Sequence, residues 1–326
     1  MDRRTRIQAA LRGEKTDRVP LSLWRHFHRQ DRTADGLASA TLAFARQYDL
    51  DLIKLTPSGL YAVEDWAQGH ITYPGTEHEP PFLHSPAVDH PEDWGRLQPL
   101  APEVGALGRE LEAIRRVVRG SGGELPLVMT IFSPLTLAYK LSGEIVIEHL
   151  REYPRALHSG LEIIANTVAG FADAALKAGA DGLFFATQLA SHRWVTSDEY
   201  AEFGQRYDLA VLNRVAARSA LTILHLHGQH VFFDLACDER YPIQAISWHD
   251  RETYPDLVTA RQLTGRSFIT GLDRELLGLG PIDAVKAQAR EALAQTEGRG
   301  VILAPSCVIP TSTPDEFLEA VREVLV

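Results

Sequence analysis

Short apolar runs alternate with longer amphipathic stretches along this chain of 326 residues, and that alternation limits the folds it can adopt. Each run is bounded by polar or turn-forming residues, as expected for a strand buried in a parallel sheet. The predicted strands are Val19–Leu23, Leu52–Leu55, Leu127–Phe132, Gly182–Phe185, Leu221–Leu226, Ala245–Trp248, Phe268–Gly271 and Gly300–Leu303. Strand and helix alternating eight times favours an α/β fold of the closed (β/α)₈ TIM-barrel type over an open sheet.

Three segments between these runs carry helix signals. Leu157–Ala178 places apolar residues three or four positions apart, which is the spacing of a helix with one buried face. A second helix is predicted to open at Thr196, an N-cap residue that is followed by acids in the first turn. The last helix is predicted to open at Thr313, with Pro314 at the first helical position.

A long insertion, Pro57–Glu124, separates the second and third predicted strands. Its part from Thr72 to Leu100 contains six prolines and is therefore too proline-rich to be one helix. We expect it to run over the barrel mouth as a long loop or a small hairpin. The chain contains neither an internal repeat nor a linker, so we predict a single barrel domain over residues 1–326.

Charge, hydrophobicity and cysteine content limit the binding partners and the cellular compartment that we expect for this chain. A formal net charge of −10 disfavours general binding to nucleic acid, since an acidic protein repels phosphates. No run is apolar and long enough to suggest a membrane span, and the N-terminus lacks the apolar core of a secretory signal. Two cysteines, Cys237 and Cys307, argue against a disulfide framework and favour a reducing cytoplasm. We expect Cys237 to be a small buried hydrophobic residue, and a homodimer would be the commonest oligomer.

Polar residues gather where the predicted strands end, which is where TIM barrels carry their chemistry. His225 and His227 are two apart on one strand, so their side chains point to the same side. Cys307 follows the last strand, which opens into the same mouth. Two imidazoles and a thiolate that leave one position free match a catalytic zinc site. The alternative for the histidine pair is a core or capping role.

Several other strand-end residues are open to more than one interpretation. Arg25 and Arg29, four apart, form a carboxylate clamp if their segment is helical; otherwise Arg29 is simply solvated. His249-Asp250 includes a general base or supports the metal ligands. One residue of the pair Tyr139 and Lys140 faces inward. Thr187 and Gln188 follow the fourth strand, and Thr56 follows the second. His26 and His28 receive no role, and His70, His78, His84 and His90 of the insertion are expected on the surface or in a lid.

Three segments resemble the uroporphyrinogen decarboxylase superfamily: Arg6–Gly13 (RIQAALRG), Thr16–Pro20 (TDRVP) and Phe132–Ala138 (FSPLTLA). The resemblance extends over nearly the full chain and implies a (β/α)₈ barrel. It also implies one of two chemistries. One branch decarboxylates porphyrinogens, and the other moves methyl groups to thiols with zinc, often from a corrinoid.

At the site, the methyltransferase branch is more similar. Its zinc set, an H-x-C pair and a later cysteine after Ala-Pro, is matched by His225-Leu226-His227 and Ala304-Pro305-Ser306-Cys307, with His227 in place of the first cysteine. That exchange makes a zinc-bound thiol more acidic and less nucleophilic. The decarboxylase branch's arginine pair is matched by Arg25 and Arg29. Thr56, however, takes the place of its aspartate, its tyrosine falls at Lys140 or Tyr139, and its late histidine falls on or next to Cys307.

The resemblance therefore implies zinc-dependent methyl or alkyl transfer involving a thiol, with a small methyl donor or a corrinoid, delivered by a partner protein, as the source. Zinc is expected on His225, His227 and Cys307. Catalytic roles are expected for His249, Asp250, Gln188 and Arg25, and cofactor contacts for Arg29, Lys140, Tyr139 and Thr187. Decarboxylation of a porphyrinogen or another polycarboxylate is the second hypothesis, and a non-catalytic barrel that binds a tetrapyrrole or corrinoid is the third.

Overall fold

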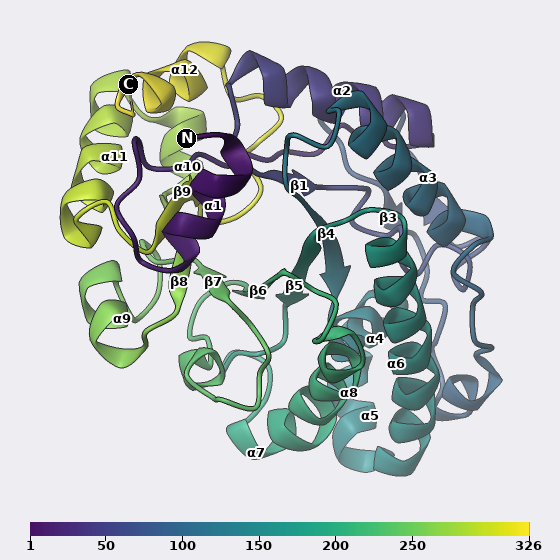
Figure 1. The fold of residues 1–326 in the computed structure, drawn as a ribbon. Helices are drawn as coiled ribbons and strands as arrows, with labels where there is room; N and C mark the ends of the chain where they lie inside the picture. The colour runs from purple at the N-terminus through teal and green to yellow at the C-terminus, as the bar shows by residue number, and fades with distance from the viewer. Residues whose placement is uncertain (326) are drawn as a thin grey trace.

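A curled parallel sheet surrounded by helices forms the centre of the molecule (Figure 1). The computed structural model describes residues 1–325. Within them, the central sheet has seven strands in the order β1-β4-β5-β6-β7-β8-β9, and every neighbouring pair is parallel. The predicted TIM-barrel class is confirmed. The strands are β1 (Ile53–Leu55), β4 (Leu127–Phe132), β5 (Gly182–Thr187), β6 (Leu221–Leu226), β7 (Ala245–Trp248), β8 (Ser267–Leu272) and β9 (Val301–Pro305).

The first predicted strand, Val19–Leu23, is wrong as a strand, although the chain does run beside β9 at this place. Leu21 forms an isolated parallel bridge with Leu303 of β9, and Leu303 N donates to the oxygen of Pro20. On the other side, Asp51 N donates to the oxygen of Leu21, while Leu21 N donates to the Asp51 carboxylate at 2.9 Å. Because Pro20 has no N–H and the N–H of Leu21 goes to a side chain, no regular ladder forms.

Helices cover the outside of the barrel. The predicted helix at Leu157–Ala178 is α6, and its predicted apolar face is buried. At α7 the Thr196 side chain and Glu199 cap each other's backbone N–H groups, as the sequence suggested. The last helix begins at Asp315, later than predicted, because Pro314 is its N-cap. The outer helices are α2 (Ala34–Gln47), α3 (Gly105–Gly120), α4 (Pro134–Ser142), α5 (Ile145–Glu152), α6 (Pro154–Lys177), α7 (Ser197–Tyr200), the π-helical η2 (Ala201–Gln205), α8 (Arg206–Val215), the 3₁₀ turn η3 (Phe233–Ala236), α9 (Leu257–Leu263), α10 (Arg274–Leu279), α11 (Ile282–Thr296) and α12 (Asp315–Glu323).

The insertion forms a small hairpin, one of the two forms predicted for it. Strands β2 (Ile71–Thr72) and β3 (Phe82–Leu83) pair antiparallel, and the 3₁₀ turn η1 (Pro91–Arg96) follows before α3. His78, between the two strands, places its Nδ1 3.0 Å from the hydroxyl of Thr311, in the loop after β9. The hairpin therefore reaches the loops at the carboxyl ends of the strands.

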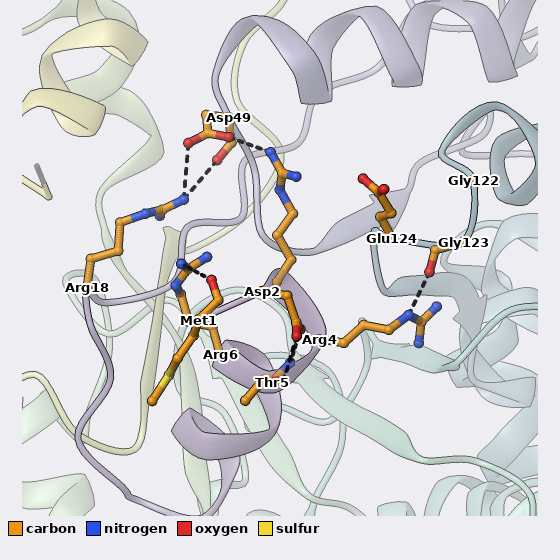
Figure 2. Close-up of a pocket in the computed structure, with 11 residues that line it drawn as sticks. Met1, Asp2, Arg4, Thr5, Arg6, Arg18, Asp49, Gly122, Gly123 and Glu124 are labelled. Atoms are coloured by element: carbon orange, nitrogen blue, oxygen red, sulfur yellow. Dashed lines mark hydrogen bonds and ion pairs between the residues drawn. The ribbon is translucent and has the colours of Figure 1, made fainter.

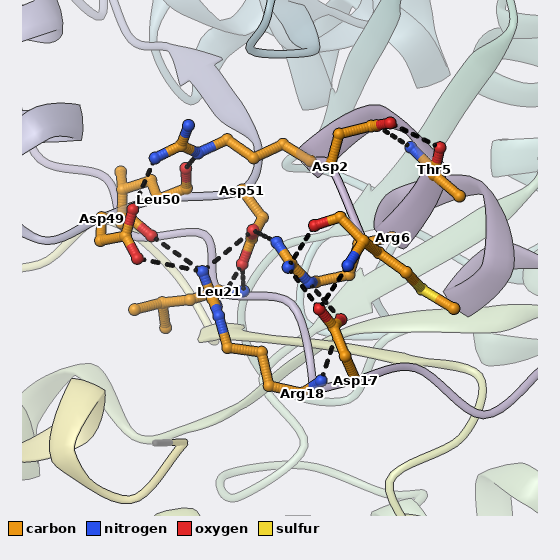
Figure 3. A network of polar contacts seen from close by, with 11 residues as sticks. Asp2, Thr5, Arg6, Asp17, Arg18, Leu21, Asp49, Leu50 and Asp51 are labelled. Atoms are coloured by element: carbon orange, nitrogen blue, oxygen red, sulfur yellow. Dashed lines mark hydrogen bonds and ion pairs between the residues drawn. The ribbon is translucent and has the colours of Figure 1, made fainter.

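A network of ion pairs joins the segments at the opposite end of the barrel (Figure 3). Helix α1 (Arg3–Leu11) lies there, and Ser267 at the start of β8 donates to the oxygen of Leu11. Asp51, fully buried, accepts from Arg6 and Arg18, each at 2.6 Å. The adjoining hollow in Figure 2 is lined by the same arginines, already engaged with acids or backbone oxygens. We assign these ion pairs a role in stability, because TIM barrels carry their chemistry at the other end.

None of the helices in residues 1–325 combines the length and the hydrophobicity that a bilayer span requires.

Candidate active site

A cavity of about 240 Å³ opens at the carboxyl ends of the strands. Its wall combines aromatic side chains with histidines, a cysteine and cationic groups. The lining residues are Trp24, His26, Lys54, Thr56, Pro57, Gly59, Thr130, Phe132, Lys140, Phe184, Ala186, Gln188, His225, His227, Arg274, Cys307 and Val308. The position is the one that barrels use for catalysis.

Four side chains of types that ligate metals lie together at this end of the barrel, three of them lining the cavity. His225 lies on β6 and His227 lies just after that strand. His249 comes directly after β7, and Cys307 comes two residues after β9. One ligand atom from each of the four lies within 4.8 Å of the others, and Cys307 Sγ is 3.5 Å from His227 Nδ1. The structure thus brings the three sequence-predicted ligands together. It adds His249, which the sequence left between a base and a supporting role.

The surrounding side chains orient these imidazoles. His225 Nδ1 lies 3.0 Å from the hydroxyl of Ser247 on β7, and His249 Nδ1 lies 3.2 Å from a carboxylate oxygen of Glu252. A histidine that donates through Nδ1 keeps the lone pair of Nε2 for a metal. His249 Nε2 is buried and has no hydrogen-bond partner in the described part of the chain. An orphaned nitrogen beside two imidazoles and a thiol fits a zinc ligand set.

Burial favours the metal-binding protonation states. It lowers the pKa of His225 well below its usual value and that of His227 to about 4, so both imidazoles are neutral. Burial alone would raise the pKa of the Cys307 thiol, but the nearby His249 and Arg274 side chains outweigh it, so that this pKa is lowered. Neutral imidazoles and an accessible thiolate are the forms that ligate metals.

Three cationic side chains line the same cavity, and no Asp or Glu of residues 1–325 does. Lys54 on β1 is 6% exposed, and burial lowers its pKa to about 7. Its Nζ lies 3.3 Å from the Thr56 hydroxyl and 4.5 Å from the centre of the Phe184 ring. Burial also lowers the pKa of Lys140 to about 8. Arg274, at the start of α10, completes the set.

Sequence reasoning missed Lys54 and Arg274. A signal for Lys54 was present, because it precedes Thr56 by two residues and therefore shares its side of the strand. Of the Tyr139 and Lys140 pair, Lys140 faces the cavity, whereas Tyr139 packs on Trp194 with ring centres 5.3 Å apart.

Three other predicted residues fall into different places. Gln188 lines the cavity, and its backbone N–H donates to the Thr136 hydroxyl at 2.9 Å. Thr187 does not line it; its hydroxyl donates to the oxygen of His225 at 3.1 Å and so fixes β6 against β5. Asp250 accepts from the Thr270 hydroxyl and from Gly271 N at 3.2 Å, which ties the end of β7 to β8. Burial raises the pKa of Asp250.

The arginine clamp lacks the helix it depends on. The backbone of Arg25 pairs with Ile309 in a parallel bridge, so the segment is extended there. The Arg25 guanidinium lies 5.3 Å from the centre of the Phe44 ring, outside the cavity, and Arg29 is exposed. The prediction for Cys237 is also wrong in burial: it follows η3 and is exposed to solvent.

The chain is similar to known methyltransferases and decarboxylases. A family model described as uroporphyrinogen decarboxylase (URO-D) matches residues 2–325. The methylcobamide:CoM methyltransferase MtaA of Methanosarcina barkeri is 25% identical over 341 residues, which cover 97% of this chain and 95% of MtaA. The uroporphyrinogen decarboxylase of Edwardsiella ictaluri is 30% identical over 186 residues, covering 54% of this chain and 50% of that protein.

A solved structure, described as a methyltransferase from Methanosarcina mazei, has the same fold. It matches with a TM-score of 0.83 at 24% identity and covers 99% of this chain and 98% of its own. Since the family model spans nearly the whole sequence, the chain belongs to the uroporphyrinogen decarboxylase (URO-D) family.

Proposed function

We propose that this protein transfers a methyl or other small alkyl group to a thiol that carries a negative charge, with zinc held by the histidine and cysteine cluster. The observation that carries the proposal is the convergence of four ligand atoms within 4.8 Å of one another, beside three cationic side chains in one cavity. The relatives named methylcobamide:CoM methyltransferases support the same chemistry.

His225, His227 and Cys307 border the cavity, whereas His249 does not line it. We infer that the three bordering residues are the ligands a bound thiol would face, and that His249 completes the set from the buried side. Zinc, when bound, lowers the pKa of a thiol so that the nucleophilic thiolate is present at neutral pH.

The cationic side chains select and orient the thiol. Lys54, Lys140 and Arg274 would bind its anionic group, because a charged hydrogen bond in a buried cavity is stronger than one in water. The aromatic rings of Trp24 and Phe184 form an apolar wall that suits a methyl group and excludes water. After the thiol loses its proton, its sulfur lone pair forms the S–C bond. As this bond forms, the bond from carbon to the donor breaks, and its electron pair leaves with the donor.

The size of the cavity favours a small thiol. About 240 Å³ lies below the roughly 300–1,000 Å³ usual for sites that enclose drug-sized ligands. A tetrapyrrole is larger still, so a corrinoid donor would meet the cavity from outside, on a partner protein or free in solution. We propose a cytoplasmic setting, in keeping with two unpaired cysteines.

Decarboxylation of a small polycarboxylate is the second candidate, because the same three cations would also bind carboxylates. In this decarboxylation, the cluster of His225, His227 and Cys307 would take no part. The two candidates therefore differ in what the loss of Cys307 does.

The test combines metal analysis with turnover. We expect purified protein to contain zinc and to methylate CoM from a methylcobamide, and Cys307→Ala to lose both the zinc and the activity. Cys237→Ala, at the other cysteine, is the matched control and should retain both. Zinc-free protein, or unchanged turnover in Cys307→Ala, would overturn the proposal. Release of CO₂ from a polycarboxylate by Cys307→Ala would favour the second candidate.

A further inference from the structure

A second cluster of ligand-type side chains lies beside the mouth cavity, in the segment that precedes α2. One donor atom each from His26, His28 and Asp31 lies within 4.8 Å of the others. Two zinc ligands with bonds of about 2.0–2.1 Å lie about 3.4 Å apart in tetrahedral geometry, so side-chain rotations would bring these donors onto one ion. Neither the methyl transfer nor the decarboxylation uses these three residues.

The local backbone builds the cluster. His26 and His28 are two apart in an extended segment and so point to the same side, with their rings stacked at 5.1 Å. The chain then turns, because Gln30 N and Asp31 N both donate to the oxygen of Phe27 at 2.8 Å. The turn brings the Asp31 carboxylate back to His28, whose Nδ1 lies 4.0 Å from Asp31 Oδ2. That distance is too long for a hydrogen bond.

Four polar atoms of the cluster are buried without hydrogen-bond partners in the described part of the chain. His28 is 9% exposed and Asp31 1% exposed. Nδ1 of both histidines and both carboxylate oxygens of Asp31 lack a hydrogen-bond partner in residues 1–325. The nearby arginines are engaged elsewhere, since Arg109 pairs with two glutamates and Arg32 stacks on Tyr73. Burying a carboxylate with no hydrogen-bond donor is unfavourable, and a cation bound beside it would offset that cost.

We propose that His26, His28 and Asp31 form a second metal site, for zinc or another divalent transition-metal ion. Two imidazole nitrogens and one carboxylate suit such ions, whereas Mg²⁺ and Ca²⁺ prefer oxygen ligands. A cavity of about 400 Å³, lined by His26, His28 and His78 among others, leaves the ion accessible to water or to a substrate group. The site does not depend on the thiol chemistry proposed above.

The second ion would add positive charge to the wall of the mouth. His26 and Arg274 border both cavities. The ion would therefore lie next to the cations that line the mouth, and its free positions would take an anionic oxygen of a bound molecule. The ligand class of the site is thus a carboxylate, phosphate or similar oxyanion bound through the metal.

Cobalt loading of the metal-free protein tests the site, because thiolate ligands give Co²⁺ an intense charge-transfer band that nitrogen and oxygen ligands do not. We expect the wild-type protein to bind two equivalents, one for each cluster. His28→Ala and Asp31→Asn should each lose one equivalent while keeping the thiolate band. Cys307→Ala should lose the band and keep the other equivalent. His84→Ala, at an exposed histidine of the hairpin, is the control and should bind like wild type.

The thiolate band also reports on folding, so a variant that keeps it has kept the barrel. His28→Ala and Asp31→Asn that keep both the band and the full cobalt stoichiometry would overturn the second site. So would a wild-type protein that binds one equivalent only, at the thiolate. A protein that loses cobalt in His28→Ala but shows no thiolate band would support this site and count against the zinc site of the proposed function.

Discussion

Replacing Lys54 with methionine tests whether the mouth cavity recognises the charge of its substrate. Lys54 is 6% exposed, and no acid lines the cavity within the described residues, so its charge is available to a ligand. Two opposite charges about 4 Å apart attract by about 4 kcal/mol at an effective dielectric constant of about 20. Desolvation and competition with water reduce the net contribution to about 1.5–3 kcal/mol. Methionine fills similar space without the charge.

The assay compares kcat/KM for a charged thiol and for a neutral thiol of equal length. We expect Lys54→Met to lower the value for the charged thiol by about 10- to 150-fold, the equivalent of 1.5–3 kcal/mol, and to leave the neutral thiol nearly unchanged. Lys177→Met, at an exposed lysine of α6, is the control and should match wild type for both. An equal loss for both thiols would refute the reasoning, since Lys54 would then support the fold and not the recognition.

Three further predictions concern pH, metal binding and stability. Burial lowers the pKa of Lys54 to about 7, so the charge that binds the thiol is lost as the pH rises through that value. KM for the charged thiol should therefore rise there in wild type, and an identical rise in Lys54→Met would contradict this assignment. Glu252→Gln weakens the orientation of His249 and should lower zinc affinity about 10-fold in competition with a chelator; unchanged affinity would mean that Glu252 does not orient a ligand. Asp51→Asn leaves Arg6 buried without one of its partners and should lower the free energy of unfolding by about 3 kcal/mol in urea, and a loss within error would show that the pair contributes little.

The sheet was predictable because both of its faces are covered. Strands in such a sheet are continuous apolar runs, and Leu127–Phe132 and Leu221–Leu226 have the bounds that the sequence predicted. Val19–Leu23 is also apolar, but its pairing depends on Asp51, which is distant in sequence and takes the N–H of Leu21. Local pattern does not show which acceptor a backbone N–H will find.

The candidate metal centre was predictable where the two-residue period of a strand fixes the side to which the side chains point. His225 and His227 share a side because they are two apart on a strand, and Cys307 follows the strand that ends beside them. His249 follows β7, and its place in the cluster depends on how β6, β7 and β9 curl around the mouth. The sequence places Lys54 on the same side of its strand as Thr56, but an apolar run alone does not show whether that side faces the barrel interior or the helices.

The segment after Leu21 shows how one bridge decides which side chains reach the mouth. Arg25 pairs with Ile309, and in this extended stretch alternate residues face opposite ways. Arg25 therefore packs toward Phe44, whereas His26 lines the mouth and His28 the cavity next to it. A shift of one residue would exchange the two sets, as it does for any strand. The register that removes the arginine from the mouth is thus the same one that delivers two histidines to Asp31.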